Sequence, residues 1–176
     1  VRLKKVENLL LAFKKVIAKV PDAELYIVGS GPQEEGKLKN LAKELDLTSK
    51  VFFTGYVAEE EKIRLMKKAW ILVQPSIAEG FGLVLVEANA CKTPVIAVDS
   101  GGPREVIREG RTGFLIQPNN IKQLAEKIIE ILGDKNRVLK MGEEGRKVVE
   151  ENYTWEKVAE KVEKIILEYL KQKYRN

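Results

Sequence analysis

The sequence contains no histidine, and Cys91 is its single cysteine. Without histidine the chain has no imidazole base, no Ser-His-Asp triad and no histidine ligand for a metal. A single cysteine excludes an internal disulfide and a cluster of thiolate ligands. Because Cys91 follows an apolar helical segment, we expect it to be an inert core residue.

Long apolar runs are also lacking. No run approaches the ~20 residues that a helix needs to span a bilayer, and the sequence shows no signal-peptide pattern. From what remains we expect a cytoplasmic protein, and we keep open a peripheral association of the full-length protein with the inner face of a membrane. Since the chain starts at Val1 rather than at a methionine, an upstream segment also stays open.

The sequence has no basic block that also carries aromatic residues. Its 31 Lys and Arg and 26 Asp and Glu give a net charge of +5, and they are interleaved along the expected helix surfaces. Nucleic-acid binders concentrate such charge on one face, so we expect no nucleic-acid partner. A phosphate-bearing small ligand is compatible with this charge. The many Lys and Glu residues are typical of thermophilic proteins.

Short apolar segments alternate with segments of helical periodicity along the chain. This alternation predicts right-handed βα units, and therefore one α/β domain over residues 1–176 with a Rossmann-like, doubly wound parallel sheet. Strands are expected at 24–29, 51–55, 70–75, 94–98 and 113–118. Helices are expected at 6–20, 33–45, 59–69, 82–90, 103–110, 120–133, 134–152 and 154–174.

Ligands of such sheets bind beyond the carboxyl ends of the strands, which selects the loops that follow the strands. The loop GSGP at 29–32 lacks the third glycine of a dinucleotide fingerprint, and we interpret it as a tight turn from strand to helix. NAD binding therefore receives little support. The loop from Pro75 to Gly82 is richer in functional groups.

That loop leads into a helix that is expected to start near Gly82. Gly80 and Gly82 allow a sharp turn and a close approach of a ligand to the backbone. The first amides of the helix, on Leu83 and Val84, would point into the cleft with the positive end of the helix dipole. Such an arrangement suits a phosphate or a diphosphate.

Two carboxylates flank the expected anion site: Glu79 precedes it, and Glu87 lies more than one turn inside the helix. They could form a catalytic pair, a sugar-binding pair or two unrelated surface charges. A place on the helix surface is the commoner fate of a lone Glu such as Glu87. The apolar neighbours of Glu87 indicate a buried helix. A carboxylate there needs hydrogen-bond partners, and ligand hydroxyl groups would provide them.

Two further segments favour structural roles. In GGPREVI, Gly102 fits the N-cap, Pro103 the first helical position and Glu105 the third, where an acid stabilises exposed amides. Thr154 fits the cap of the last helix, and Trp155 is interpreted as a packing anchor.

The segment EGFGLVLVEA at 79–88 matches the E-x7-E motif of the retaining family 4 glycosyltransferases of the GT-B fold. The whole chain resembles the carboxyl-terminal, donor-binding domain of that family. Six blocks in the right order carry the resemblance: RLKKVENLLLAF, LYIVGSGP, VFFTGYV, residues 75–107, GRTGFLIQP and YTWEKVAE.

The resemblance implies roles for individual residues. Glu79 would contact hydroxyl groups of the transferred sugar, Glu87 the ribose hydroxyls, and Lys4 the donor phosphates, so Glu79 and Lys4 are the implied catalytic residues. A lysine can stabilise the negative charge that develops on a diphosphate leaving group. The remaining implied donor-binding residues hold the diphosphate or lie near the base: Gly80, Phe81, Gly82, Leu83, Val84, Val57 and Lys62.

The resemblance also implies that no cofactor and no metal is needed beyond the nucleotide-diphosphate sugar, since no Asp-x-Asp motif is present. The family's first strand, with its arginine, and its amino-terminal domain have no counterpart in this sequence. That domain would bind the acceptor, which is a sugar, a lipid or another molecule. We therefore expect weak nucleotide binding and no transfer by this chain alone.

The reading that we adopt is the donor-binding domain of a retaining glycosyltransferase that moves a hexosyl group from a nucleotide-diphosphate sugar to an acceptor. Two alternatives remain open. Nucleotide-sugar epimerases share the two-domain cleft but need acid and base groups that this chain does not show. A non-catalytic nucleotide-binding module would use the same fold without transfer.

Overall fold

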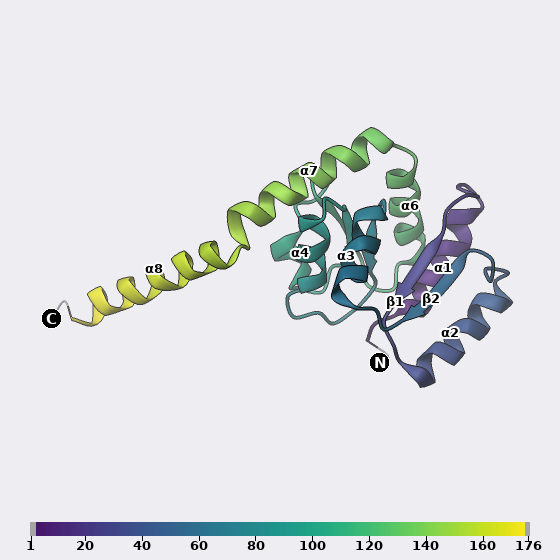
Figure 1. Cartoon of the computed structure of the whole chain (residues 1–176), viewed down its shortest axis with the longest axis horizontal. Coiled ribbons are helices and arrows are strands. Elements are labelled where there is room, and N and C mark those ends of the chain that lie inside the picture. Colours follow the sequence, from purple (N-terminus) through teal and green to yellow (C-terminus); the bar gives the residue numbers. More distant parts are fainter. Residues whose placement is uncertain (1–2, 175–176) are drawn as a thin grey trace.

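The computed structural model describes residues 3–174, apart from the side chains of residues 32 and 33. Helices and strands alternate along the first two thirds of the chain, and helices follow to the end (Figure 1). The strands are β1 (Leu25–Val28), β2 (Val51–Gly55), β3 (Leu72–Gln74), β4 (Val95–Val98) and β5 (Gly113–Ile116). The helices are α1 (Val6–Ile17), α2 (Pro32–Glu44), α3 (Glu59–Lys68), α4 (Leu83–Ala90), α5 (Pro103–Val106), α6 (Ile121–Leu132), α7 (Lys135–Asn152) and α8 (Trp155–Lys173).

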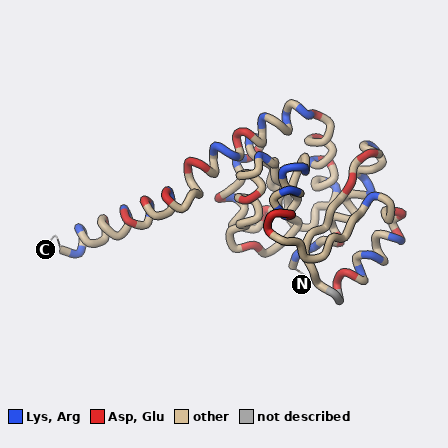
Figure 2. The backbone as a smooth tube through the Cα atoms, viewed as in Figure 1, with Lys and Arg blue, Asp and Glu red and all other residues tan. Residues whose placement is uncertain are grey.

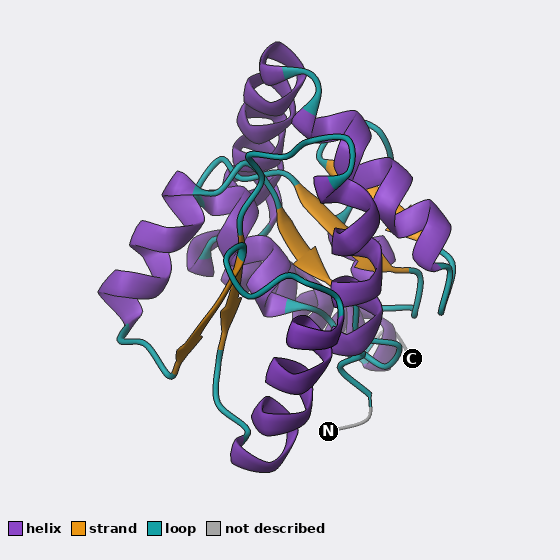
Figure 3. Ribbon diagram, turned by 90° about the vertical axis from the view of Figure 1, so that its right-hand side faces the viewer, coloured by secondary structure: helices purple, strands orange, loops and turns teal. Residues whose placement is uncertain are grey.

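All strand pairs are parallel, and each expected strand is present, so the predicted α/β class is confirmed. The strands form two sheets, β1-β2 and β3-β4-β5, rather than one continuous sheet (Figure 3). Within residues 3–174 no strand pairs with both β1 and β3, so the two sheets are not joined by backbone hydrogen bonds.

Strand β4 is the centre of the second sheet and is buried on both faces. Ile96 and Val98 belong to the larger core, which also contains residues of α1, α6 and α7, whereas Val95 and Ala97 pack in a second cluster with α4 and α5. Successive side chains of a strand point to opposite faces, so helices cover both sides of this sheet. This packing fixes the loops at the carboxyl ends of β3 and β4.

Helix α5 is shorter than expected, because it ends at Val106 instead of continuing to residue 110. Ile107 has an extended backbone and a buried side chain, and Gly110 turns the chain with a φ of 71°. The apolar Ile107 therefore continues the core packing without continuing the helix. Gly102 is the N-cap and Pro103 the first helical residue, as expected.

Helix α8 extends away from the rest of the molecule (Figure 1), and none of its residues is buried. Thr154 caps it as expected, with its side chain accepting a hydrogen bond from the Lys157 amide at 3.3 Å. The interpretation of Trp155 as a packing anchor is wrong, because its side chain is 87% exposed at the start of α8. A helix that leaves the body offers its first residues little surface to pack on.

Positions of Lys and Arg lie among positions of Asp and Glu along the helices of the backbone trace (Figure 2). Several of these charged residues form ion pairs with a residue three or four positions away on the same helix, such as Lys39 with Glu35 and Arg146 with Glu150. Among the helices within residues 3–174, none has both the length and the apolar character to cross a membrane.

Candidate functional site

The loop that follows β3 leads directly into α4, as the sequence predicts. Gly82 is the N-cap of α4 and has a φ of 88°, a left-handed conformation that favours glycine. A side chain at this position would also meet Leu85 and the Gln74 amide oxygen. The first backbone hydrogen bond of the helix comes from the Leu85 amide, so the amides of Leu83 and Val84 precede the helical ladder.

A second loop, after β4, lies against the first one. Glu79 and Gly101 form an isolated parallel bridge between the two loops. A Cβ added at Gly102 would overlap the carbonyl oxygen of Gly80, so the two backbones are in close contact at this point. The segment GGPRE therefore borders the expected donor site and also shapes it.

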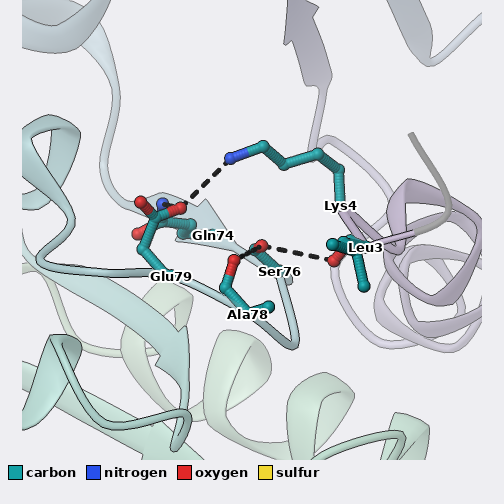
Figure 4. A network of polar contacts seen from close by, with 6 residues as sticks. All are labelled: Leu3, Lys4, Gln74, Ser76, Ala78 and Glu79. Carbon is teal, nitrogen blue, oxygen red and sulfur yellow. Dashed lines mark hydrogen bonds and ion pairs between the residues drawn. The ribbon is translucent and has the colours of Figure 1, made fainter.

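Glu79 receives two hydrogen bonds on the same carboxylate oxygen, Oε2 (Figure 4). Lys4 Nζ donates one at 3.1 Å, and Gln74 Nε2 donates the other at 2.7 Å. The Glu79 side chain is 20% exposed and the Lys4 side chain 54%. The two implied catalytic residues are therefore adjacent, although they lie far apart in the sequence.

Backbone contacts of Leu3 place Lys4 beside Glu79. The Leu3 carbonyl accepts a hydrogen bond from the Ile77 amide at 3.0 Å. The Ser76 hydroxyl lies 3.2 Å from the same carbonyl and 3.0 Å from that of Ala78, and can donate to one of them at a time (Figure 4). The loop that carries Glu79 therefore also anchors the segment ahead of α1.

Glu87 differs from expectation, because its side chain is 42% exposed rather than enclosed by the apolar neighbours. Its Oε2 accepts a hydrogen bond from Lys62 Nζ of α3 at 3.0 Å. Lys62 also pairs with Glu59 at 3.0 Å, and hydrogen bonds to Glu59 and Glu87 raise the pKa of Lys62. The structure therefore places Lys62 at the expected ribose carboxylate.

The other expected residues lie around this centre. Val57 is half-buried in the loop between β2 and α3. Phe81 packs its ring edge-on against Tyr153, with 5.7 Å between the ring centroids, and joins the second core cluster. Cys91 follows α4 and is half-buried, and burial raises the pKa of its thiol, which favours the unreactive protonated form.

Three further residues contribute to the site and were not predicted from the sequence: Gln74, Ser76 and Tyr153. Gln74 is the last residue of an apolar strand and is only 9% exposed, so a polar residue at that point was the available signal. Ser76 acts through a contact with Leu3 that no local pattern reveals. Tyr153 donates from its hydroxyl to the Glu105 carbonyl at 2.6 Å, and thereby connects the end of α7 to α5.

The arrangement suits a ligand with a negatively charged centre and hydroxyl groups at both ends. The amides of Leu83 and Val84 and the ammonium of Lys4 favour negative charge. The carboxylates of Glu79 and Glu87 accept hydrogen bonds from hydroxyl groups. Over residues 3–174 no group of three or more His, Cys, Asp or Glu side chains could hold a metal ion, and metal independence stays a prediction.

Known proteins are similar to this chain in sequence and in fold. The mannosyltransferase of Corynebacterium glutamicum named GDP-mannose-dependent monoacylated alpha-(1-6)-phosphatidylinositol monomannoside mannosyltransferase is 36% identical over 167 residues, which are 91% of this chain and 43% of that protein. The structure of sucrose-phosphate synthase from Thermosynechococcus elongatus matches with a TM-score of 0.86 and 32% identity, covering 97% of this chain and 43% of that one. The chain thus spans less than half the length of these relatives.

A separately solved domain matches over most of its length. The C-terminal domain of a glycosyl transferase group 1 family protein from Francisella tularensis has a TM-score of 0.79 and 28% identity, covering 88% of this chain and 82% of that one. The family described as glycosyl transferases group 1 matches residues 1–148. The chain therefore belongs to the group 1 glycosyl transferases, and it corresponds to the C-terminal domain of the GT-B fold.

Proposed function

We propose that the chain binds the nucleotide-diphosphate sugar donor of a retaining hexosyltransferase. The observation that carries the proposal is the pair of lysine–glutamate contacts on either side of the α4 N-terminus, Lys4 with Glu79 and Lys62 with Glu87. Each contact joins an expected donor-binding carboxylate to a lysine, and the start of α4, which lies between Glu79 and Glu87 in the sequence, favours negative charge. Membership of the group 1 family and the GDP-mannose-dependent relative support this assignment.

In the proposed complex the diphosphate lies at the amides of Leu83 and Val84, with the sugar toward Glu79 and the ribose toward Glu87. The bond between the anomeric carbon and the diphosphate oxygen breaks, and the diphosphate leaves with the electron pair. Lys4 and the helix dipole stabilise that charge, while Glu79 orients the sugar. The acceptor oxygen forms the new bond on the same face of the sugar, and its proton passes to the departing diphosphate oxygen. The acceptor is bound by a part of the protein outside this chain.

The proposal includes further properties of the whole protein. The reaction uses no metal and no cofactor beyond the donor. The protein acts in the cytoplasm, and a lipid acceptor would bring it to the inner face of the membrane, in keeping with the lipid-linked substrate named for the C. glutamicum relative. This chain alone binds nucleotide weakly and transfers no sugar.

A panel of UDP-, GDP- and ADP-sugars, tested for transfer with the full-length polypeptide, tests the proposal. We expect one donor to be preferred, and Glu79→Ala to lower the transfer rate at least about tenfold, since a lost hydrogen bond to a charged group is worth roughly 1.5–3 kcal/mol. Transfer within a few-fold of wild type in Glu79→Ala would remove the role of Glu79. Incubation with donor alone distinguishes an epimerase, which would release an epimer without acceptor.

A further inference from the structure

The side chain of Gln74 occupies an unusual place for a polar residue. It is the last residue of β3, it is 9% exposed, and its carboxamide lies between Glu79 and the N-cap of α4. Neighbouring positions of this strand, Leu72 and Val73, are apolar. Gln74 therefore joins the carboxylate side of the site to the amide side.

The hydrogen bond to Glu79 fixes which way the carboxamide points. Gln74 Nε2 donates to Glu79 Oε2 at 2.7 Å. The reversed amide would set two acceptor oxygens against each other, so the contact with the carboxylate determines the assignment. Because Lys4 also donates to Oε2, the hydrogen bonds to this carboxylate within the described residues leave Oε1 for a ligand.

The other end of the carboxamide is costly to bury. Among residues 3–174 the Gln74 oxygen Oε1 has no hydrogen-bond partner, and it lies against Gly82, where an added Cβ would be 3.3 Å away. An unpaired buried acceptor lowers stability, and an apolar side chain of the same length would avoid that loss. Gln74 is therefore poorly explained by folding alone.

Lys4 and Gln74 respond differently to an incoming diphosphate. Lys4 is charged and 54% exposed on its side chain, so a diphosphate can draw it away from Glu79. Gln74 is neutral and buried and has no such competing attraction. Once Lys4 moves to the phosphates, Gln74 is the contact that keeps Glu79 oriented.

We propose that Gln74 is a positioning residue that acts through Glu79, holding Glu79 Oε2 so that Oε1 meets the hydroxyl groups of the donor sugar. The inference rests on the proposed function and adds a residue to it. Gln74 does not touch the ligand in this account, so its effect requires the Glu79 carboxylate.

Calorimetry with this chain tests the proposal through Gln74→Met, which keeps the length of the side chain and removes the donor. The ligands are a nucleoside diphosphate and the matching nucleotide-sugar, chosen from the UDP, GDP and ADP series. We expect the variant to bind the nucleotide-sugar about tenfold more weakly, because the orienting hydrogen bond is to a charged group, and the nucleoside diphosphate within about twofold of wild type. The midpoint of thermal unfolding should stay close to that of wild type, because the lost hydrogen bond to Glu79 and the removal of the unpaired oxygen Oε1 have opposite effects on stability.

A double-mutant cycle separates positioning from packing. In a Glu79→Ala background, Gln74→Met should change nucleotide-sugar affinity less than about twofold, since there is no carboxylate left to orient. Equal losses for both ligands, an unchanged affinity for both, or additive effects in the cycle would overturn the role of Gln74. The proposed function fails if the wild-type chain binds no ligand of any series. That result is visible before any variant is measured, and it would overturn the role of Gln74 as well.

Discussion

Lys4 is joined to Glu79 by an ion pair in which the lysine side chain is 54% exposed. Exposed pairs of this kind contribute about 0–1 kcal/mol to stability, whereas a charge that meets a phosphate contributes more. We therefore predict that Lys4→Met leaves the unfolding midpoint nearly unchanged and weakens nucleoside diphosphate binding roughly tenfold. Calorimetry and thermal unfolding measure the two effects.

Lys5→Met is the matched control for this prediction. Lys5 is the next residue and pairs with Glu7 at 3.7 Å rather than with Glu79. Its loss should leave nucleotide affinity within about twofold of wild type, because the charge faces another element. Equal losses for the two variants would mean that Lys4 acts only through the net charge of the chain.

Two glycines of the site offer a second comparison at the residue scale. A Cβ at Gly102 would overlap the Gly80 carbonyl, whereas a Cβ at Gly80 has no neighbouring atom within 4 Å. We predict that Gly102→Ala lowers the unfolding free energy by about 1–3 kcal/mol, because backbone must move to admit the methyl group. The unfolding free energy of Gly80→Ala should stay within about 0.5 kcal/mol of the wild-type value. Urea unfolding of both variants measures the difference, and equal stabilities would contradict the close contact of the two loops.

At the scale of elements, Tyr153 connects the junction of α7 and α8 to the site. Its hydroxyl donates to the Glu105 carbonyl at 2.6 Å, its ring packs on Phe81, and burial raises the pKa of its phenol. A raised pKa means that the protonated phenol stabilises the fold below about pH 10, and this contribution is lost as the pH rises through the folded-state pKa.

We predict that Tyr153→Phe lowers the unfolding free energy at pH 7 by about 1 kcal/mol, the usual contribution of one hydrogen bond. The difference from wild type should shrink above about pH 10, because the ionised phenol no longer donates. Tyr26→Phe is the control: Tyr26 also has a raised pKa, from its hydrogen bond to Glu24, but its side chain is 47% exposed. Urea unfolding from pH 7 to 11 measures both variants. At pH 7 the unfolding free energy of Tyr26→Phe should differ little from that of wild type. A difference for Tyr153→Phe that stays constant across this range would contradict the role of the hydroxyl.

Elements were predictable from the sequence where their ends carry local signals. Helices α6 and α7 start after Asn120 and Asp134, whose side chains accept hydrogen bonds from the amides of Gln123 and Arg137. The end of α5 was mispredicted because Ile107 continues the apolar pattern in an extended conformation. Contacts between elements, such as Lys62 with Glu87, depend on how helices pack and leave no local pattern.

The site shows the same limit. The motif identified Glu79 and Glu87, and the start of α4 at Leu83 agrees with the expected amide site. The exposure of Glu87 and the contact between Gln74 and Glu79 come from tertiary packing, which a helix-by-helix reading does not contain. Whether these residues bind a donor stays a prediction.

At the scale of the whole molecule, α7 and α8 differ sharply in how they attach to the body. Helix α7 packs on α4 and buries Val138, Met141 and Val149, and Arg146 donates to the Ala90 carbonyl at 2.7 Å. Helix α8 buries no residue and exposes an apolar stripe that includes Val162, Ile165, Ile166 and Tyr169. The body should therefore fold without α8 but not without α7.

We predict that truncation after Tyr153 preserves cooperative thermal unfolding and lowers the midpoint by no more than about 4 °C, the shift that 1 kcal/mol produces in a domain of this size. Truncation after Lys140 is the contrasting variant, since it removes the buried Met141 and Val149 that lie between α7 and the core. It should abolish the cooperative transition, because losing large buried side chains costs several kcal/mol out of about 5–15. Circular dichroism at matched protein concentrations follows the thermal unfolding of both truncated chains. A chain that loses its transition with the removal of α8 alone would show that α8 stabilises the body through contacts that its exposed residues do not reveal.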